Sequence, residues 1–318
     1  MRYSAPMPPA VSSPSRAMLL ARLAIPALLL ANVVLACGPW LVRLAQSESH
    51  VGPVAAAFWR LTLALPLFVL AGIKASEPRP RAWGWPFAIA ALSGVFFAAD
   101  LGAWHIGILH TRLANATLFG NITAILFPAY GFLAARLWPS RRQSIAMGLA
   151  LVGAVLLLGR SYELAAQNIA GDLFCIFAGL CYTVYLIALD RVRSQLGPIT
   201  ILTLSAAAGI PGMLLVSLGL GERIWPDDWT PLILLTLGSQ IVGQGMILFA
   251  VKRVAPIVVG LMLLTQPIVG AAIGWAIYGE RLTILDLIGG LGIAIAVLLV
   301  RDSRRPLPEE QNGLSSPA

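Results

Sequence analysis

Residues 251–300 read VKRVAPIVVGLMLLTQPIVGAAIGWAIYGERLTILDLIGGLGIAIAVLLV. Two continuous apolar runs, 255–279 and 283–300, stand on either side of one short polar turn. As helices, apolar runs of about 18 residues or more can cross the roughly 30 Å hydrocarbon core of a bilayer. They do not alternate apolar and polar residues as the strands of membrane β-barrels do. The stretch therefore predicts two membrane-spanning helices joined by a tight turn.

Comparable apolar runs recur along the whole chain of 318 residues. The chain is 58% hydrophobic and only 11% charged, whereas soluble domains are about 25% charged. We therefore expect an all-α membrane protein with ten transmembrane helices and no soluble domain between them. The expected spans are 21–43, 53–73, 84–109, 113–136, 143–159, 169–189, 198–220, 230–250, 255–279 and 283–300. Residues 1–17, rich in Pro and Ser, and residues 302–318 are expected to be polar tails, the first of them disordered.

The 22 Lys and Arg residues lie mainly in the short connectors between the expected spans. The net charge of +8 therefore does not indicate nucleic-acid binding, which would place a basic patch on one face of a domain. With ten spans, sixteen of the 22 basic residues fall on the side that carries both tails. Because cytoplasmic connectors are the ones enriched in Lys and Arg, we expect both tails to be cytoplasmic.

The chain contains an internal repeat. The triplet at Gly52–Val54 matches the one at Gly197–Ile199, and HTRLANA at 110–116 is echoed by VKRVAPI at 251–257. The repeat divides the chain into residues 18–160 and 161–301, with five expected spans in each half. Because five is odd, the second half must enter the membrane from the opposite side. Two inverted five-helix repeats are typical of transporters, whose binding site lies near the midplane between the halves.

The motifs of the repeat resemble a known family. Residues 251–300, with their short basic connector, Pro267, the turn at Gly279–Arg281 and a Gly-rich last span, resemble the closing pair of spans of the EamA family in the drug/metabolite transporter superfamily. Residues 110–159 resemble the same unit in the first half. There Trp138–Pro139 stands where the second half has Gly279–Glu280, so we assign Glu280 a local role in the turn.

This resemblance implies a ten-helix exporter of small metabolites, amino acids or drugs in the bacterial inner membrane. It also implies a pocket drawn from the third, fourth, eighth and ninth spans, with help from the first and the sixth. It does not name a substrate, because the family is broad.

Three acids lie inside the expected spans. Asp286 forms a capping-box pattern with Thr283 at the start of the last span. Asp172 lies in the first turn of the sixth span, where the helix dipole favours negative charge. Asp100 has neither explanation, because it lies nine residues before the end of the third span, roughly 13 Å deep at 1.5 Å per residue. A charge at such depth costs about 2.5–3.5 kcal/mol on insertion scales.

Arg60 is the one basic residue well inside a span, and its depth matches that of Asp100. One interpretation is a structural Asp100–Arg60 ion pair. The other is a pocket carboxylate that binds the amine of a substrate or carries a coupling proton, and the two are compatible. Trp104 follows Asp100 by one turn on the same helix face. Its ring could contact an amine through cation–π attraction, or it could simply pack against a neighbour.

Uncharged polar side chains complete the predicted pocket. They fall near mid-depth on the first, fourth, sixth, eighth and ninth spans, as a shared central cavity requires. They are Asn32, Asn121, Tyr182, Gln240, Gln244 and Gln266. Hydrogen bonds between helices would explain each of them singly, whereas their common depth favours a substrate site. The cavity would then be asymmetric, with an acid in the first half and amides in the second.

The sequence contains no Gly-rich phosphate loop, metal-ligand cluster or nucleophile–base pair, so we expect no enzyme, no cofactor and no metal. We expect a secondary transporter that exports small metabolites or amino acids by alternating access, as a monomer or homodimer, with proton coupling as one option. A sugar-nucleotide or phosphate-ester antiporter is the alternative of the same superfamily, and it would need more Lys or Arg inside the spans. A membrane sensor or scaffold is the non-transport alternative, and it would normally carry a soluble output domain.

Overall fold

The computed structural model of the chain describes residues 16–74, 84–111, 113–158, 166–278 and 282–301. The tail at 302–318, most of the tail at 1–17, and Glu280 lie outside these residues. Over the described residues the chain is helical, without β-strands.

The first half contains seven α-helices and the second half contains the rest, among which η1 is a short 3₁₀-helix and η2 is a π-helix. In chain order they are α1 (Arg16–Ala36), α2 (Gly38–Ser49), α3 (Pro53–Lys74), α4 (Trp85–His110), α5 (Leu113–Gly120), α6 (Thr123–Ala135), α7 (Arg141–Leu158), η1 (Ala166–Asn168), α8 (Ile169–Val192), α9 (Pro198–Gly219), α10 (Thr230–Leu235), η2 (Thr236–Gln244), α11 (Gly245–Val251), α12 (Pro256–Leu263), α13 (Thr265–Tyr278) and α14 (Ile284–Val300).

Eight helical segments of the described chain are long and apolar enough to cross a membrane. They match eight of the ten expected spans. The other two expected spans, 143–159 and 283–300, correspond to α7 with 18 residues and α14 with 17 residues. The prediction of an all-helical membrane protein is confirmed, and the count of ten crossings stays a prediction.

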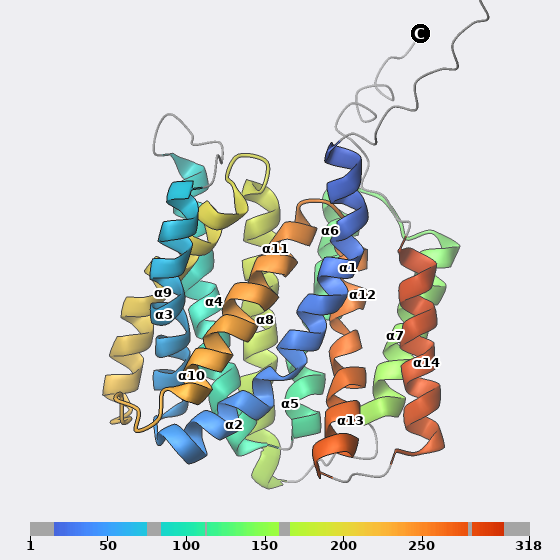
Figure 1. Cartoon of the computed structure of the whole chain (residues 1–318). Coiled ribbons are helices and arrows are strands. Elements are labelled where there is room, and N and C mark those ends of the chain that lie inside the picture. Colours follow the sequence, from blue (N-terminus) through green and yellow to red (C-terminus); the bar gives the residue numbers. More distant parts are fainter. Residues whose placement is uncertain (1–15, 75–83, 112, 159–165, 279–281, 302–318) are drawn as a thin grey trace, which may run out of the picture.

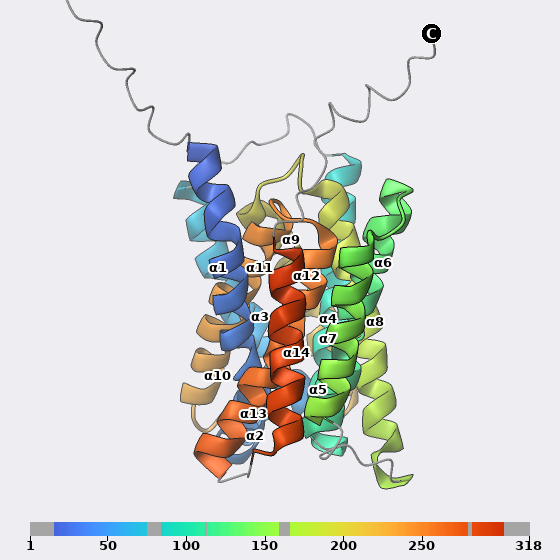
Figure 2. The ribbon, with the colours of Figure 1, turned by 90° about the vertical axis from the view of Figure 1, so that its right-hand side faces the viewer.

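The helices form one elongated bundle (Figure 1). The beginning of α1 and the end of α14 lie at the same end of this bundle, which we call the near end. The short helix α2, the end of α13 and the beginning of α14 lie at the opposite end, which we call the far end. Turning the molecule shows α7 and α14 side by side along one flank (Figure 2).

Glycine residues let the helices of the bundle approach closely. A Cβ atom added to Gly94 on α4 would lie 2.2 Å from the carbonyl oxygen of Ser205 on α9. One added to Gly153 on α7 would lie 2.6 Å from the carbonyl oxygen of Gly289 on α14, and the reverse holds for Gly289. In a bilayer the hydrophobic effect does not drive helices together, because lipid chains are as apolar as the side chains. Small residues at the crossings let the helices pack closely enough for van der Waals contact to hold them.

Four of the expected continuous spans are interrupted. The first breaks at Cys37 between α1 and α2, the fourth at residues 121–122 between α5 and α6, and the ninth at Leu264 between α12 and α13. The eighth contains the π-helix η2 between α10 and α11. Pro39 and Pro267 each stand in the first turn after a break, where a missing N–H costs nothing. The sequence correctly singled out Pro267, but the break lies three residues earlier, at Leu264.

Candidate functional site

A cavity of about 1440 Å³ extends from the middle of the bundle to the far end. All four interrupted spans contribute to its wall, together with α3, α4, α8 and α14. Discontinuous helices commonly line substrate sites in transporters, because their unpaired backbone groups need a cavity or a ligand. π-Helical turns are likewise frequent at functional sites.

Seven residues that the sequence assigned to a pocket line this cavity. They are Arg60, Asp100, Trp104, Asn121, Tyr182, Gln244 and Gln266. They come from α3, α4, the break after α5, α8, η2 and α13. Residues as far apart in sequence as Arg60 and Gln266 therefore face one space.

Asn32 and Gln240 do not belong to the lining and lie directly behind it. Asn32 is fully buried on α1, where it accepts a hydrogen bond from Gln266 Nε2 at 2.9 Å and donates one to the Leu28 carbonyl oxygen at 2.8 Å. Gln240 is also buried, and its Oε1 accepts a hydrogen bond from Arg60 Nε at 3.1 Å. Both residues therefore orient a lining side chain and do not themselves face the cavity.

Arg60 and Asp100 do not form the direct ion pair that their matched depths suggested. Among the described residues, the ion pairs within 4.0 Å do not include these two groups. The side chain of Arg60 is turned instead toward Gln240, which binds its Nε and leaves its terminal nitrogens without a described protein acceptor. Asp100 is partly buried and accepts no hydrogen bond from the part of the chain that the structure describes.

The cavity lining therefore includes a basic and an acidic side chain, Arg60 and Asp100, that form no direct ion pair. Lipid offers a charged group no partner at this depth. Gln240 binds only Nε of Arg60, so within the described part of the chain the terminal nitrogens of Arg60 and the carboxyl group of Asp100 are left to water or a ligand. An arrangement of two opposite charges that do not neutralise each other can bind a molecule that carries both.

Trp104 forms the side of the cavity next to Asp100. Its indole ring lies between two helices that each present a glycine to it. A Cβ atom on Gly38 of α2 would lie 3.5 Å from the ring, and one on Gly120 of α5 would lie 3.1 Å from Nε1. The sequence placed Trp104 near the pocket, and the structure adds that these glycines make room for the ring.

Two polar side chains near the cavity hold helices together. His105 is fully buried, with Nδ1 at 3.0 Å from the carbonyl oxygen of Pro53 on α3. Asp172 on α8 accepts hydrogen bonds from Thr111 Oγ1 at 2.6 Å and from Asn115 Nδ2 at 3.0 Å. The helix dipole alone does not account for Asp172, since it anchors the end of α4 and the start of α5. The capping box of Thr283 with Asp286 is confirmed.

Sequence reasoning missed the mouth of the cavity at the far end. Trp40 and Arg43 on α2 line it, as does His110 at the end of α4. Arg43 was counted as a connector charge because the first span was expected to run through residue 43. The Gly38–Pro39 pair was the available signal, since it allows α2 to leave the axis of α1 and extend across the far end (Figure 1).

The described part of the chain gathers no group of three or more His, Cys, Asp or Glu side chains that could hold a metal ion. The side chains that line the cavity carry charges, amides, hydroxyl groups and aromatic rings.

Comparison with known proteins identifies the family. Residues 22–159 and 169–301 each match the EamA-like transporter family. The threonine/homoserine exporter RhtA of Escherichia coli (strain K12) is 26% identical over 205 residues, which are 64% of this chain and 68% of the relative. RhtA of Salmonella typhimurium (strain LT2) is 25% identical over the same length. The uncharacterized transporter YyaM of Bacillus subtilis (strain 168) is 20% identical over 262 residues, 78% of this chain and 84% of that one.

The fold has also been seen in a crystal structure of a protein that is 17% identical. It aligns with a TM-score of 0.69 and covers 93% of this chain and 100% of the other. Because the family matches twice and spans most of both halves, the chain belongs to the EamA-like transporter family and is a multi-pass membrane transporter of the drug/metabolite type.

Proposed function

We propose that this protein is a secondary transporter that exports small zwitterionic metabolites, amino acids above all, across the bacterial inner membrane by alternating access. The observation that carries the proposal is the unpaired Arg60 and Asp100 on the wall of one cavity. An amino acid carries a carboxylate that suits the guanidinium and an ammonium group that suits the carboxylate. Charge-assisted hydrogen bonds of this kind are about twice as strong as neutral ones.

The absence of a direct contact between Arg60 and Asp100 supports this assignment. In a direct ion pair the two charged groups would satisfy each other, and neither would be available to a ligand. Here Gln240 binds Arg60 Nε, so the terminal nitrogens are free to form a forked contact with a carboxylate. The RhtA relatives are threonine/homoserine exporters, which supports the amino-acid class.

The orientation follows from the distribution of basic residues. If the tail-bearing near end is cytoplasmic, the far end faces the exterior, and the cavity opens outward. The two matched segments support two repeats of five spans in inverted orientation, in which related motions would open the cavity to either side. A proton on Asp100 is then one means by which export could be coupled to the membrane potential.

A phosphate-ester or sugar-nucleotide antiporter fits the cavity less well. A phosphate group carries up to two negative charges, and Asp100 lines the same cavity as Arg60. The carboxylate would repel such a ligand at close range. Gln244 and Gln266 in the same lining carry no positive charge, and the second arginine of the lining, Arg43, lies at the mouth of the cavity.

The experiment that tests the proposal is counterflow in proteoliposomes. Vesicles loaded with one unlabelled neutral amino acid should accumulate the same labelled amino acid, and protein-free vesicles should not. Competitors should rank with zwitterions first, and with amines that lack the carboxylate or acids that lack the amine far behind. Uptake of phosphorylated compounds, with no response to any amino acid, would favour the antiporter.

A further inference from the structure

The first turn of α3 is capped by a residue from the other half of the chain. Glu222 lies in the connector between α9 and α10, and its Oε2 accepts a hydrogen bond from the Ala55 N–H at 2.7 Å. Its Oε1 accepts one from the Val54 N–H at 3.2 Å. The first N–H groups of a helix have no partner within the helix, so the carboxylate supplies what the local sequence does not.

The carboxylate of Glu222 occupies the space that a side chain at position 52 would need. A Cβ atom on Gly52 would lie 2.3 Å from the carboxyl carbon of Glu222. The Gly52 N–H also donates to the carbonyl oxygen of Arg223 at 3.2 Å. Only the smallest residue leaves room here for the side chain of Glu222.

Two further contacts join α3 to the same connector. Trp59, on the next turn of α3, donates from Nε1 to the carbonyl oxygen of Ile224 at 2.6 Å. Its ring packs against Trp225 and Trp229, with centroids 5.3 Å and 4.8 Å away. A cluster of tryptophans at the end of membrane helices is typical of the interface with water.

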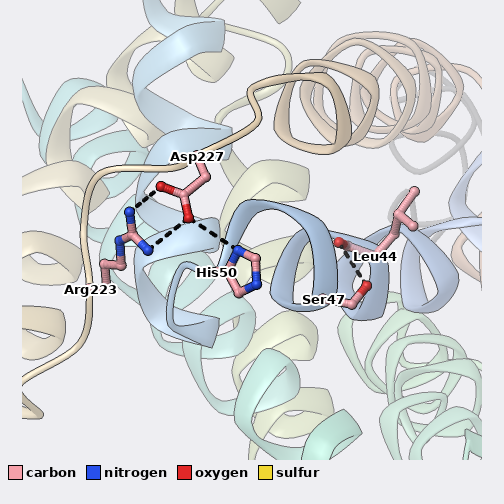
Figure 3. Close-up of polar contacts among 5 residues, drawn as sticks. All are labelled: Leu44, Ser47, His50, Arg223 and Asp227. Atoms are coloured by element: carbon pink, nitrogen blue, oxygen red, sulfur yellow. Dashed lines mark hydrogen bonds and ion pairs between the residues drawn. The ribbon is translucent and has the colours of Figure 1, made fainter.

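The connector also contacts the end of α2, through Asp227. Asp227 lies between Arg223 and His50, and it binds both side chains (Figure 3). The Nδ1 atom of His50 is 3.1 Å from Asp227 Oδ2. The backbone N–H of Asp227 donates to the carbonyl oxygen of Ser49 at 3.0 Å. The connector is therefore held to the α2–α3 corner by both backbone and side chains.

The last contact of this series lies in the substrate cavity. Arg60 follows Trp59 directly, and its Nε donates to Gln240, which belongs to η2 on the segment that follows the connector. The first two turns of α3 thus contact residues 222–240 at three levels. These are the Glu222 cap, the tryptophan cluster and the Arg60–Gln240 hydrogen bond. A shift at Glu222 would move the backbone that carries Arg60.

We propose that Glu222 is a positioning residue for the substrate site, which fixes the start of α3 to the α9–α10 connector and so holds Arg60 against Gln240. The proposal rests on the function proposed above only in taking Arg60 as the carboxylate-binding group. Glu222 itself does not line the cavity and touches no substrate.

The hydrogen bonds from Glu222 to the start of α3 should depend on pH, because Glu222 can be protonated. Burial raises the pKa of Glu222 above its ordinary value, against the opposing effect of the N–H groups of Ala55 and Val54. The other charged or titratable side chains on α2, on α3 and on the connector are Arg43, Glu48, His50, Arg60, Lys74, Arg223, Asp227 and Asp228. As the pH falls through the raised pKa, the carboxyl group gains a proton and one of its oxygens no longer accepts well. The cap therefore weakens at an acidic outer surface.

The test compares Glu222→Ala, Glu222→Gln and Gly52→Ala with Glu48→Gln, a matched acid on the exposed face of α2. Gly52→Ala displaces the carboxylate without removing it. Both alanine variants should raise the KM for amino-acid counterflow about tenfold with little change in maximal rate, because a lost cap weakens positioning by that order. Glu222→Gln should lie between them and wild type, and should lose the rise in KM that wild type shows on acidification.

A second readout does not depend on the substrate. Amide exchange at Val54 and Ala55 should accelerate about tenfold in both alanine variants. Nitroxides at Leu67 on α3 and Leu237 on η2, both exposed side chains, should give one narrow distance distribution in wild type and a broad one in Glu222→Ala. These labels require a background in which the three native cysteines are replaced.

The outcomes separate this proposal from the proposed function. Faster exchange with an unchanged KM and unchanged label distances would show that Glu222 only caps a helix, and would overturn the positioning role. Unchanged exchange would overturn the cap itself. If wild-type vesicles move no amino acid, the substrate assignment fails, while a broadened label distribution in Glu222→Ala would still support the positioning role.

Discussion

The near half and the far half of the bundle differ in how they fill their interior. In the near half, the last turns of α8 present Leu186, Leu189 and Val192, all fully buried in the same apolar cluster as Val251 and Val258. In the far half, the same bundle surrounds a cavity of about 1440 Å³. The helices that cross the near half run without a break, although α1, α3 and α6 contain Pro26, Pro66 and Pro128 in their interiors. The breaks and the π-helix border the cavity.

Polar contacts follow the same division. In the near half charged groups find protein partners, as where Arg193 Nε pairs with Asp190 at 2.8 Å and its Nη1 donates to the Lys252 carbonyl oxygen at 3.1 Å. In the far half, Arg60 and Asp100 line the cavity without a direct ion pair between them. The near half therefore supplies a closed support, and the cavity proposed as the substrate site lies where the helices are interrupted.

The largest expected effect comes from removing either charge of the cavity. Arg60→Gln and Asp100→Asn should each lower kcat/KM for amino-acid export by about a hundredfold or more, since a charged hydrogen-bonding group contributes about 1.5–3 kcal/mol and its loss leaves the partner unpaired. Counterflow in proteoliposomes measures it. Arg142→Gln and Glu48→Gln, on exposed surfaces, are the controls. Near-normal export by either cavity variant would place the substrate elsewhere.

The near half should respond in the opposite way, with lost stability and intact chemistry. Gly94→Val would place side-chain atoms against the Ser205 backbone, where even a Cβ atom would come within 2.2 Å. Overpacking of this kind costs about 1–3 kcal/mol. Thermal unfolding in detergent should show a lower midpoint, while the protein that does fold should retain its KM. A changed KM with unchanged stability would break the distinction between the two halves.

The sequence predicts the bounds of the helices better than the breaks within them. Hydropathy alone predicted α4 within one residue at each end, and it predicted α9 comparably well. Periodicity and composition could not predict the breaks at Cys37 and Leu264, because an apolar window looks the same whether its helix is continuous or not. Pro39 and Pro267 were the only local traces of them.

Of the nine side chains that the sequence assigned to a pocket, seven line the cavity, and their role in binding stays a prediction. Depth within the spans correctly brought Arg60, Asp100 and Trp104 to one cavity. Depth could not show that Arg60 turns to Gln240, because that bond joins residues 180 positions apart and depends on how α3 packs against η2. Glu222 looked like an ordinary acid in a connector for the same reason.

The smallest expected effect concerns a cap at the edge of the cavity. Thr283→Ala removes the side chain that pairs with Asp286 in the capping box of α14. Loss of such a cap costs about 1 kcal/mol. Denaturation should therefore show a small loss of stability, with transport close to wild type. A large loss of transport would mean that the start of α14 takes part in substrate binding, and the functional region would have to be extended to it.

The most direct test of the proposed zwitterion site measures which charge on the substrate Arg60 and Asp100 each recognise. Wild type, Arg60→Gln and Asp100→Asn are each challenged in counterflow with an amino acid, its decarboxylated amine and its deaminated acid. Wild type should prefer the amino acid strongly over both analogues. Arg60→Gln should lose the preference over the amine alone, and Asp100→Asn should lose the preference over the acid alone. If both variants lost activity toward all three compounds equally, with no change in preference, Arg60 and Asp100 would be structural and the zwitterion site would be contradicted.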